Sequence, residues 1–478
     1  MKEKIDGRTK EHGGNMRKIC AILAAFMICN LLITFSFAQT NVAEPENSVS
    51  DTVPDCTLSP DQIISETAVM IDADTGQVLF EKDMNRKMVP ASLTKIMTAI
   101  LALENGDMDS ILTADQEIID DVYSYGLETS HIALTVGERI SLKDALYACL
   151  LESANDATAL IAKSIGGSLD HFVEMMNEKA QELGAGNTHF VNSHGLHDDN
   201  HYTTAYDLAL ITKYALTLPD FEKIISTDQY TMAPTNNQES ERYFWNQNQM
   251  IQSSYYYNED VVGGKLGWTE EANNTMMALG ERDGRRLICV LLKSVAANAK
   301  YQDCETLLNY GFENFKSIPI DIAKEIPAGV DIMDKFGQLA GDVTISSAPT
   351  VSYLIHNHLT EDDVQVKIHV PEYYLLDQEI QAGFTIQLKD GVDCMPNEPL
   401  DFSLETKSHI NANMSMARET TNSGSQIFLI IGFGLLAFLL LLVIALFVIR
   451  AVVRRNVRQR YSLRSRKVHI DQRIRRRL

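Results

Sequence analysis

Cysteine is scarce in this chain, and the spacing of the few cysteines matches no known framework. Seven occur among 478 residues, and five remain if a signal peptide ending at Ala38 is removed. That odd number leaves at least one thiol unpaired, and no two of the five have the spacing of a zinc site or of a disulfide-rich scaffold. We therefore expect no metal site and no disulfide framework. Cys149 and Cys289 lie in apolar runs and are expected to be small core residues.

Acidic residues greatly outnumber basic ones in the long central part of the chain. The net charge is −22, but the first 38 residues carry +3 and the tail from Arg450 to Leu478 carries +11. Residues 39 to 426 therefore carry −36. A surface of that sign repels phosphate backbones, which excludes a general nucleic-acid surface in the central region. The acidic excess favours solubility and does not by itself identify a substrate.

The N-terminus has the charge pattern of a secretory signal. A basic leader, Met1 to Lys18, is followed by the uncharged and mostly apolar run Ile19 to Phe37. Ser36-Phe37-Ala38 fits the small-residue site at which a signal peptidase cuts. We expect residues 1–38 to be a signal peptide that is cleaved after Ala38.

A second apolar run near the C-terminus predicts a membrane anchor. Ile427 to Ile449 contains no charge and no proline. At 1.5 Å per residue it makes a helix of about 35 Å, enough to cross a bilayer with some tilt. The arginine-rich tail Arg450 to Leu478 follows at once, which marks the cytoplasmic side. Arginine runs also occur in nucleic-acid binders, but this position favours a role in topology and in contact with anionic lipid. Residues 39–426 are then expected outside the cell membrane.

A serine and a lysine one helical turn apart form the clearest chemical motif. Ser92-Leu93-Thr94-Lys95 places Lys95 Nζ within reach of Ser92 Oγ on one helix face. Pro90 belongs at a helix start, where free backbone N–H groups favour an oxyanion. A buried lysine near other cations can lose its proton and make the serine a nucleophile. The alternative for this motif alone is an amphipathic helix with a surface lysine.

Two further motifs complete a set that suits acyl transfer through a serine ester. Ser153-Ala154-Asn155 would supply a proton relay, Ser153, and an amide partner for the substrate, Asn155. Lys265-Leu266-Gly267-Trp268-Thr269 would add a positive charge from a strand edge. Ser153 and Asn155 cannot share a helix face, so we expect the helical pattern from 141 to 165 to break near them.

Together these motifs resemble those of low-molecular-mass penicillin-binding proteins, which are serine-type D-alanyl-D-alanine carboxypeptidases. The stretches 187–196 and 201–208 are also similar to that family, so the resemblance covers roughly residues 60 to 315. It implies an α/β (α+β) penicillin-binding/β-lactamase-like transpeptidase fold. It also implies peptidoglycan stem peptides as substrates, β-lactams as covalent inhibitors, and no cofactor.

The resemblance also implies a role for each motif residue. Ser92 would attack the carbonyl between two D-alanines while Lys95 accepts its proton. Ser153 with Lys265 would return a proton to the leaving amine. The N–H groups of Ser92 and Trp268 would form the oxyanion hole. Substrate binding would fall to five residues: Asn155, Lys265, Gly267, Trp268 and Thr269.

The third motif departs from the family at Leu266, where a threonine or serine is usual. A leucine cannot donate the hydrogen bond that helps to hold the substrate's carboxylate. We expect Leu266 to face the cleft and to weaken or re-specify the enzyme, and Leu266→Thr to raise its efficiency. The alternative is that Leu266 points into the sheet core. Two other functions stay open: a β-lactamase-like hydrolase, or a cell-wall-binding relative that has lost turnover.

Composition and periodicity divide the chain into seven parts. Hairpins are expected around Asp74-Thr75-Gly76 and Asp283-Gly284, mainly helices from 91 to 216, and a closing helix at 301–312. His194, His197 and His201 lack a zinc spacing and are expected to be cleft or surface loop residues. The parts are a signal peptide (1–38), a flexible lead (39–59), the catalytic domain (60–316), a small all-β domain (317–407), a linker (408–426), the transmembrane helix (427–449) and a basic cytoplasmic tail (450–478).

Overall fold

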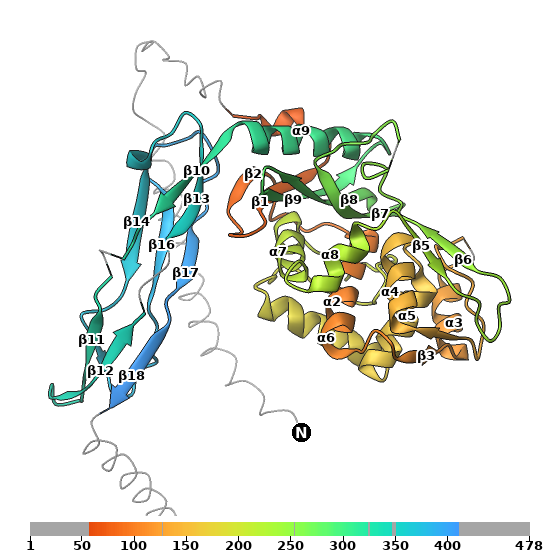
Figure 1. Ribbon diagram of the computed structural model, residues 1–478, viewed down its shortest axis with the longest axis horizontal. Helices are drawn as coiled ribbons and strands as arrows, with labels where there is room; N and C mark the ends of the chain where they lie inside the picture. The colour runs from red at the N-terminus through yellow and green to blue at the C-terminus, as the bar shows by residue number, and fades with distance from the viewer. Residues whose placement is uncertain (1–56, 127, 253, 324–325, 347–349, 411–478) are drawn as a thin grey trace, which may run out of the picture. The chain divides into compact units, whose positions relative to one another are not determined.

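The computed structural model describes residues 57–126, 128–252, 254–323, 326–346 and 350–410. Its centre is a five-stranded antiparallel sheet with the strand order β2-β1-β9-β8-β7. Two strands precede the helical region and three follow it, as the family resemblance implies (Figure 1). The strands are β1 (Thr67–Asp72), β2 (Val78–Lys82), β7 (Val261–Thr269), β8 (Asn273–Arg282) and β9 (Arg285–Ser294).

Each face of the sheet is buried against helices, which explains why the central residues of β1, β8 and β9 are apolar on both faces of the sheet. Side chains alternate between the faces. Met277 and Val290 join the cluster formed with the helical layer, whereas Met276 and Leu291 join the cluster formed with α9 (Ala299–Glu313). The edge strand β7 therefore presents one side to the helical layer and the other to the α9 side.

The helical layer lies between β2 and β7 in sequence and on the face of the sheet opposite α9 (Figure 1). A short 3-10 turn, η2 (Ala91–Thr94), leads directly into its first helix. The helices are α2 (Lys95–Asn105), α3 (Gln116–Ser124), α4 (Leu142–Leu151), α5 (Asn155–Gly166), α6 (Leu169–Glu182), α7 (Ala205–Ala215) and α8 (Pro219–Ile225). Two small hairpins accompany them, formed by β3 (Ile111–Thr113) with β4 (Arg139–Ser141) and by β5 (Gln229–Met232) with β6 (Arg242–Trp245).

The predicted break in the second long helical pattern is present. Helix α4 ends at Leu151, α5 begins at Asn155, and Ser153 between them has a positive φ of 59°. Both predicted hairpin turns are also present. Asp283 and Gly284 have φ of 53° and 78°, which fits the positive dihedrals of a type I′ turn.

The described residues that follow α9, up to Ile410, are mainly strands, as the predicted small all-β domain requires. Strand β18 continues to Ile410, so the predicted linker from 408 begins within a strand. Within this described region the strands form three sheets. They are β10 (Phe315–Ile320) with β13 (Val351–His356); β15 (Tyr373–Leu375), β11 (Gly329–Met333), β12 (Leu339–Ile345) and β18 (Thr406–Ile410); and β14 (Val364–His369), β16 (Gly383–Leu388) and β17 (Leu400–Ser403).

Within the described residues, no helix is long and apolar enough to cross a membrane. The predicted signal peptide (1–38), most of the lead (39–59), most of the linker (408–426), the anchor (427–449) and the basic tail (450–478) lie outside those residues.

Candidate active site

Ser92 and Lys95 meet at the junction of η2 and α2. Lys95 Nζ lies 2.9 Å from Ser92 Oγ, 2.7 Å from Asn155 Oδ1 and 2.7 Å from the carbonyl oxygen of His194. The last two atoms can only accept hydrogen bonds. A neutral amine can donate to both and still offer its lone pair to the Ser92 hydroxyl. The arrangement therefore suits Lys95 as the base that activates Ser92.

Burial and a neighbouring cation favour the neutral form of Lys95. Its side chain is completely buried, and burial together with the charge of Lys265 holds the pKa of Lys95 well below its usual range. The surface-lysine alternative is thereby wrong. A deprotonated lysine at neutral pH is what a serine nucleophile needs.

Lys265 lies on β7 opposite Met277, on the side that faces the helical layer. It is 2% exposed, and burial lowers the pKa of Lys265 to about 8 although Cys149 and Glu152 oppose that change. Most Lys265 side chains therefore keep their proton at pH 7, and the charge of that ammonium further favours the neutral form of Lys95.

The backbone of β7 comes close to the nucleophile because residue 267 is a glycine. A Cβ at Gly267 would lie 2.8 Å from the Ser92 nitrogen and 3.1 Å from Ala91 Cβ. Thr275, across the ladder from Gly267, donates its hydroxyl to Pro90 O over 3.1 Å. The sheet edge is thus held against the turn that carries Ser92. No motif in the sequence pointed to Thr275.

The remaining residues of the third motif lie on both sides of β7. Trp268 is 66% exposed at the strand edge. Thr269 is buried, and its Oγ1 accepts a hydrogen bond from the Ala272 N–H over 3.0 Å, so the side chain also closes the turn to β8. Leu266 is paired with Met276 and packs against the cluster on the α9 side. The expectation that Leu266 faces the cleft is therefore wrong, and the alternative that it points into the sheet core holds. Side chains alternate along β7, so Leu266 and Lys265 lie on different faces of the sheet.

The Ser153 turn is fixed by backbone hydrogen bonds. The Ala154 N–H donates to Ala148 O and the Asn155 N–H to Ser130 O, over 3.1 and 2.8 Å. Glu152, which precedes Ser153, accepts a hydrogen bond from the Trp245 N–H on its Oε1 over 2.7 Å. These contacts support the positive φ of Ser153, a conformation that costs energy in a residue other than glycine. Sequence reasoning missed Glu152.

Two of the three histidines are buried, so they are not surface residues. His201 Nδ1 accepts from the Val191 N–H, so its proton is on Nε2, which donates to Thr94 Oγ1 over 2.8 Å. Thr94 Oγ1 in turn donates to Ala91 O, directly before the nucleophile. Burial, the largest cause, lowers the pKa of His201 to about 3 and keeps the ring neutral. No cluster of three metal-ligating side chains occurs in the described part of the chain.

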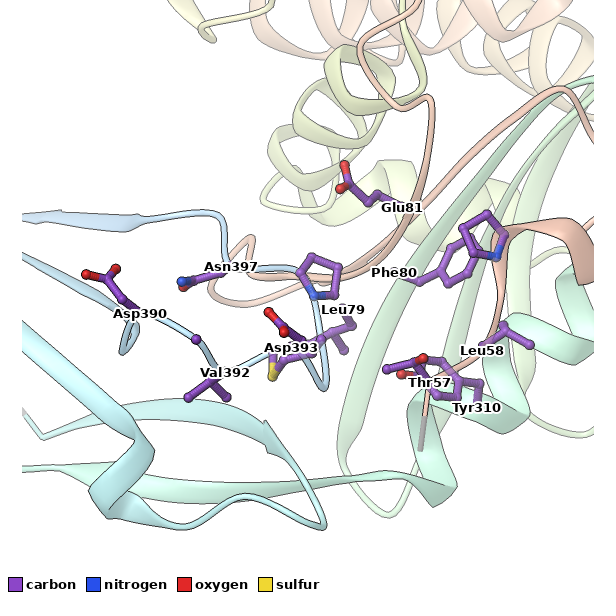
Figure 2. Close-up of a pocket in the computed structure, with 14 residues that line it drawn as sticks. Thr57, Leu58, Leu79, Phe80, Glu81, Tyr310, Asp390, Val392, Asp393 and Asn397 are labelled. Carbon is purple, nitrogen blue, oxygen red and sulfur yellow. The ribbon is translucent and has the colours of Figure 1, made fainter. Parts of the chain in front are cut away.

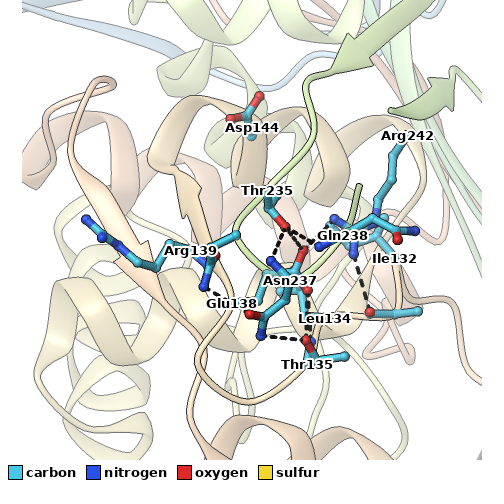
Figure 3. Close-up of polar contacts among 12 residues, drawn as sticks. Ile132, Leu134, Thr135, Glu138, Arg139, Asp144, Thr235, Asn237, Gln238 and Arg242 are labelled. Carbon is cyan, nitrogen blue, oxygen red and sulfur yellow. Dashed lines mark hydrogen bonds and ion pairs between the residues drawn. The ribbon is translucent and has the colours of Figure 1, made fainter. Parts of the chain in front are cut away.

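A buried carboxylate ties the β5–β6 hairpin to the helical layer (Figure 3). Glu138 accepts hydrogen bonds from Arg242 Nη1 and Thr235 Oγ1, each over 2.7 Å, and from the Thr135 N–H. Burial opposes ionisation, but these donors hold the pKa of Glu138 below its usual range. Arg242 and Trp245 are the first and last residues of β6. The same hairpin therefore also contacts Glu152, beside the Ser153 turn, through the Trp245 N–H.

Comparisons with known proteins agree with this geometry. A family profile described as D-alanyl-D-alanine carboxypeptidase matches residues 55–296. The D-alanyl-D-alanine carboxypeptidase DacF of Bacillus subtilis is 31% identical over 345 residues, covering 70% of this chain and 84% of the relative. DacB2 of Mycobacterium tuberculosis is 31% identical over 253 residues, covering 52% of this chain and 82% of the relative.

One solved structure shares the fold over a larger part of this chain than the family profile matches. Penicillin-binding protein 5 from Haemophilus influenzae superimposes with a TM-score of 0.58 at 24% identity, covering 73% of this chain and 98% of that protein. At that identity the likeness concerns the fold alone. With the matched profile and the relatives above, it leads to one conclusion: this chain belongs to the D-alanyl-D-alanine carboxypeptidase family and is a serine-type hydrolase.

Proposed function

We propose that this protein removes the terminal D-alanine from peptidoglycan stem peptides through an acyl-enzyme on Ser92. The contact of Lys95 Nζ with Ser92 Oγ, Asn155 and the His194 carbonyl is the observation that carries the proposal. As Ser92 Oγ attacks the carbonyl carbon between the two D-alanines, its proton passes to Lys95. The N–H groups of Ser92 and Trp268 stabilise the oxyanion that forms.

The C–N bond then breaks, and a proton must reach the leaving amine. Lys265 keeps its proton at neutral pH because its pKa is about 8, and Ser153 relays a proton between Lys265 and that amine. D-Alanine leaves, and Asn155 holds an amide carbonyl of the remaining peptide. Water then attacks the ester carbonyl, and the proton that it gives up restores Lys265. Lys95 returns its proton to Ser92 Oγ as the ester C–O bond breaks, so the shortened peptide leaves and both lysines regain their starting protonation.

The test compares one protein preparation in two assays, penicillin turnover and release of D-alanine from a D-Ala-D-Ala peptide. Stable penicillin labelling with D-alanine release supports the proposal. Rapid penicillin hydrolysis would instead indicate the β-lactamase-like alternative. Binding of the peptide without acylation would indicate a relative that has lost turnover.

Membrane anchoring is part of the proposal and is supported by sequence alone. The uncharged run 427–449 and the arginines that follow it predict one span with the tail in the cytoplasm. Protease added to intact protoplasts should digest the catalytic domain and spare a tag at Leu478. Loss of that tag while the protoplasts remain intact would contradict the topology.

Leu266→Thr is expected to bring no gain in carboxypeptidase efficiency. Leu266 packs against the cluster on the α9 side of β7, so a threonine there loses apolar contact and reaches no cleft group. The free energy of unfolding should fall by about 1–2 kcal/mol, with kcat/KM for a D-Ala-D-Ala peptide unchanged within about two-fold. Kinetics and a denaturant melt measure both. A ten-fold rise in kcat/KM would restore the original expectation that residue 266 contacts the substrate.

Glu152→Gln is expected to move the alkaline limb of the kcat/KM profile to lower pH. The charge of Glu152 raises the pKa of Lys265 against the effect of burial. Glutamine keeps an oxygen for the Trp245 N–H but removes the charge. Lys265 should then lose its proton at lower pH, and the midpoint of the alkaline limb should fall by roughly half a pH unit or more. The substitution leaves Lys95 and Cys149 in place, the two other residues that interact electrostatically with Lys265.

The matched control is Glu241→Gln, on the same hairpin but exposed and bonded only to the Tyr243 hydroxyl among its described side-chain contacts. It should leave the profile where it is. An identical profile for Glu152→Gln and wild type would show that Glu152 does not act on Lys265.

A further inference from the structure

A buried carboxylate directly follows the second motif. Asp156 is the second residue of α5 and is only 3% exposed. Its Oδ2 accepts the Leu134 N–H over 2.9 Å, and the Ile132 N–H donates to Oδ1 and Oδ2 over 3.1 and 3.2 Å. The Ala157 N–H donates to Oδ1 over 2.8 Å. Backbone N–H groups from two parts of the chain therefore meet at this one side chain.

The segment that supplies two of these donors has a strained backbone. Ala133, which lies between the two donors, is exposed and has a positive φ of 57°, a conformation that costs energy in alanine. On its other side, Arg242 Nη2 donates to the Ala133 carbonyl oxygen over 3.4 Å, and the Thr135 N–H donates to Glu138 (Figure 3). A strained conformation persists only where the surrounding contacts hold it, and Asp156 supplies the contacts on the side of the active site.

The same segment contacts the catalytic residues through one backbone hydrogen bond. The Asn155 N–H donates to the Ser130 carbonyl oxygen over 2.8 Å, and Asn155 Oδ1 accepts from Lys95 Nζ over 2.7 Å. The carboxylate of Asp156 thus fixes residues 132 and 134, and the segment in turn fixes the residue that contacts the amine of Lys95.

We propose that Asp156 is a positioning residue for the acylation of Ser92: by holding residues 130–134, its carboxylate keeps Asn155 where it orients Lys95. This role rests on the proposed acyl-enzyme mechanism. Asp156 acts through Asn155 and through its charge, and not by contact with the substrate.

The charge of Asp156 gives the role a signature that packing alone would not give. Burial and the charge of Lys265 lower the pKa of Lys95, whereas Cys149 and Asp156 raise it. His194, whose carbonyl contacts Lys95, has a neutral ring at pH 7 because burial lowers its pKa. Removing the negative charge of Asp156 should therefore lower the pKa of Lys95 further, so the amine stays neutral to lower pH.

Asp303 on α9 is a matched control. It is 2% exposed and accepts the Ile64 and Ser65 N–H groups over 2.9 and 2.8 Å, so it resembles Asp156 in burial and in donors. It lies on the other side of the sheet from the helical layer. On that side Phe80 and Tyr310 line a cavity of about 510 Å³, and no residue of the three motifs lines this cavity (Figure 2). Asp303→Asn therefore removes a buried charge far from Lys95.

The test measures the second-order rate constant for acylation of the full-length protein in detergent by a fluorescent penicillin, as a function of pH. Asp156→Asn should lower the plateau of this profile by about 10- to 100-fold, because Asn155 and Lys95 lose their alignment. It should also move the midpoint of the acid limb to lower pH by roughly half a pH unit or more. Asp303→Asn should lower the melting temperature and leave the plateau and the acid limb unchanged.

Asp156→Glu separates the position of the carboxylate from its charge. The charge stays, but the oxygens move by one methylene group, so the plateau should fall while the acid limb stays where it is. Thermal melts show which variants are folded.

A wild-type plateau or an unmoved acid limb in a folded Asp156→Asn variant would overturn the proposal, and so would an equal change of the acid limb in Asp303→Asn. If Asp156→Asn does not fold, a wild-type plateau in Asp156→Glu would overturn it instead. A wild-type protein that penicillin does not acylate on Ser92 is a different result, because it would contradict the proposed function itself.

Discussion

Ser92→Ala should abolish covalent labelling by a fluorescent penicillin, with a fall in the acylation rate of about 10⁴-fold or more. The change removes only the nucleophilic oxygen and leaves the contacts of Lys95 with Asn155 and the His194 carbonyl in place. Lys95→Ala should be almost as damaging, because the serine and its base act as one unit. Gel fluorescence after timed exposure to the antibiotic measures both.

A matched control separates the nucleophile from a general effect of removing a hydroxyl. Ser164 is exposed on α5, and Ser164→Ala should label at the wild-type rate. All three variants should show a cooperative melt, which establishes that they are folded. Labelling of a folded Ser92→Ala variant at the wild-type rate would remove Ser92 from the mechanism.

Gly195→Ala is expected to disable the site without touching a catalytic side chain. Gly195 has φ of 86°, and a Cβ there would overlap the carbonyl oxygen of Ala91 and lie 2.8 Å from Thr94 Oγ1. Ala91 immediately precedes Ser92 and already has a positive φ of 50°. The added methyl group must displace the turn that carries the nucleophile. We expect acylation to slow by at least about 100-fold, with a loss of about 2–4 kcal/mol in unfolding free energy.

Gly186→Ala provides the comparison, because its backbone does not need a glycine. A Cβ at Gly186 would meet no atom within 4 Å. That variant should acylate and melt like the wild type. Stopped-flow acylation with thermal melts measures the two effects together. Normal acylation by Gly195→Ala would show that the turn before Ser92 tolerates displacement.

Local features of the sequence predicted the parts of the site that depend on local spacing. The three-residue separation of Ser92 and Lys95 is enough to bring Oγ and Nζ together, and the incompatible helix faces of Ser153 and Asn155 required the break that is found. Turn chemistry at Asp283-Gly284 likewise gave the correct hairpin. These are contacts within a few residues of each other.

Features that depend on distant contacts were missed or wrong. The face of β7 occupied by Leu266 follows from its register with β8, and the composition of the motif carries no information on that register. His201 is buried where its ring contacts Thr94, which is more than a hundred residues away in the sequence. The sequence around Gly195 also does not show that this residue lies against the carbonyl group of Ala91, where no Cβ fits.

Release of D-alanine from a peptide ending in D-Ala-D-Ala tests the central claim most directly. Wild-type protein should release one D-alanine per peptide with repeated turnover, and trapping with penicillin should yield an acyl group on the tryptic peptide that contains Ser92. Ser92→Ala should release none above background. Equal release by wild type and Ser92→Ala, or no release by a wild-type protein that penicillin labels on a different residue, would contradict the account.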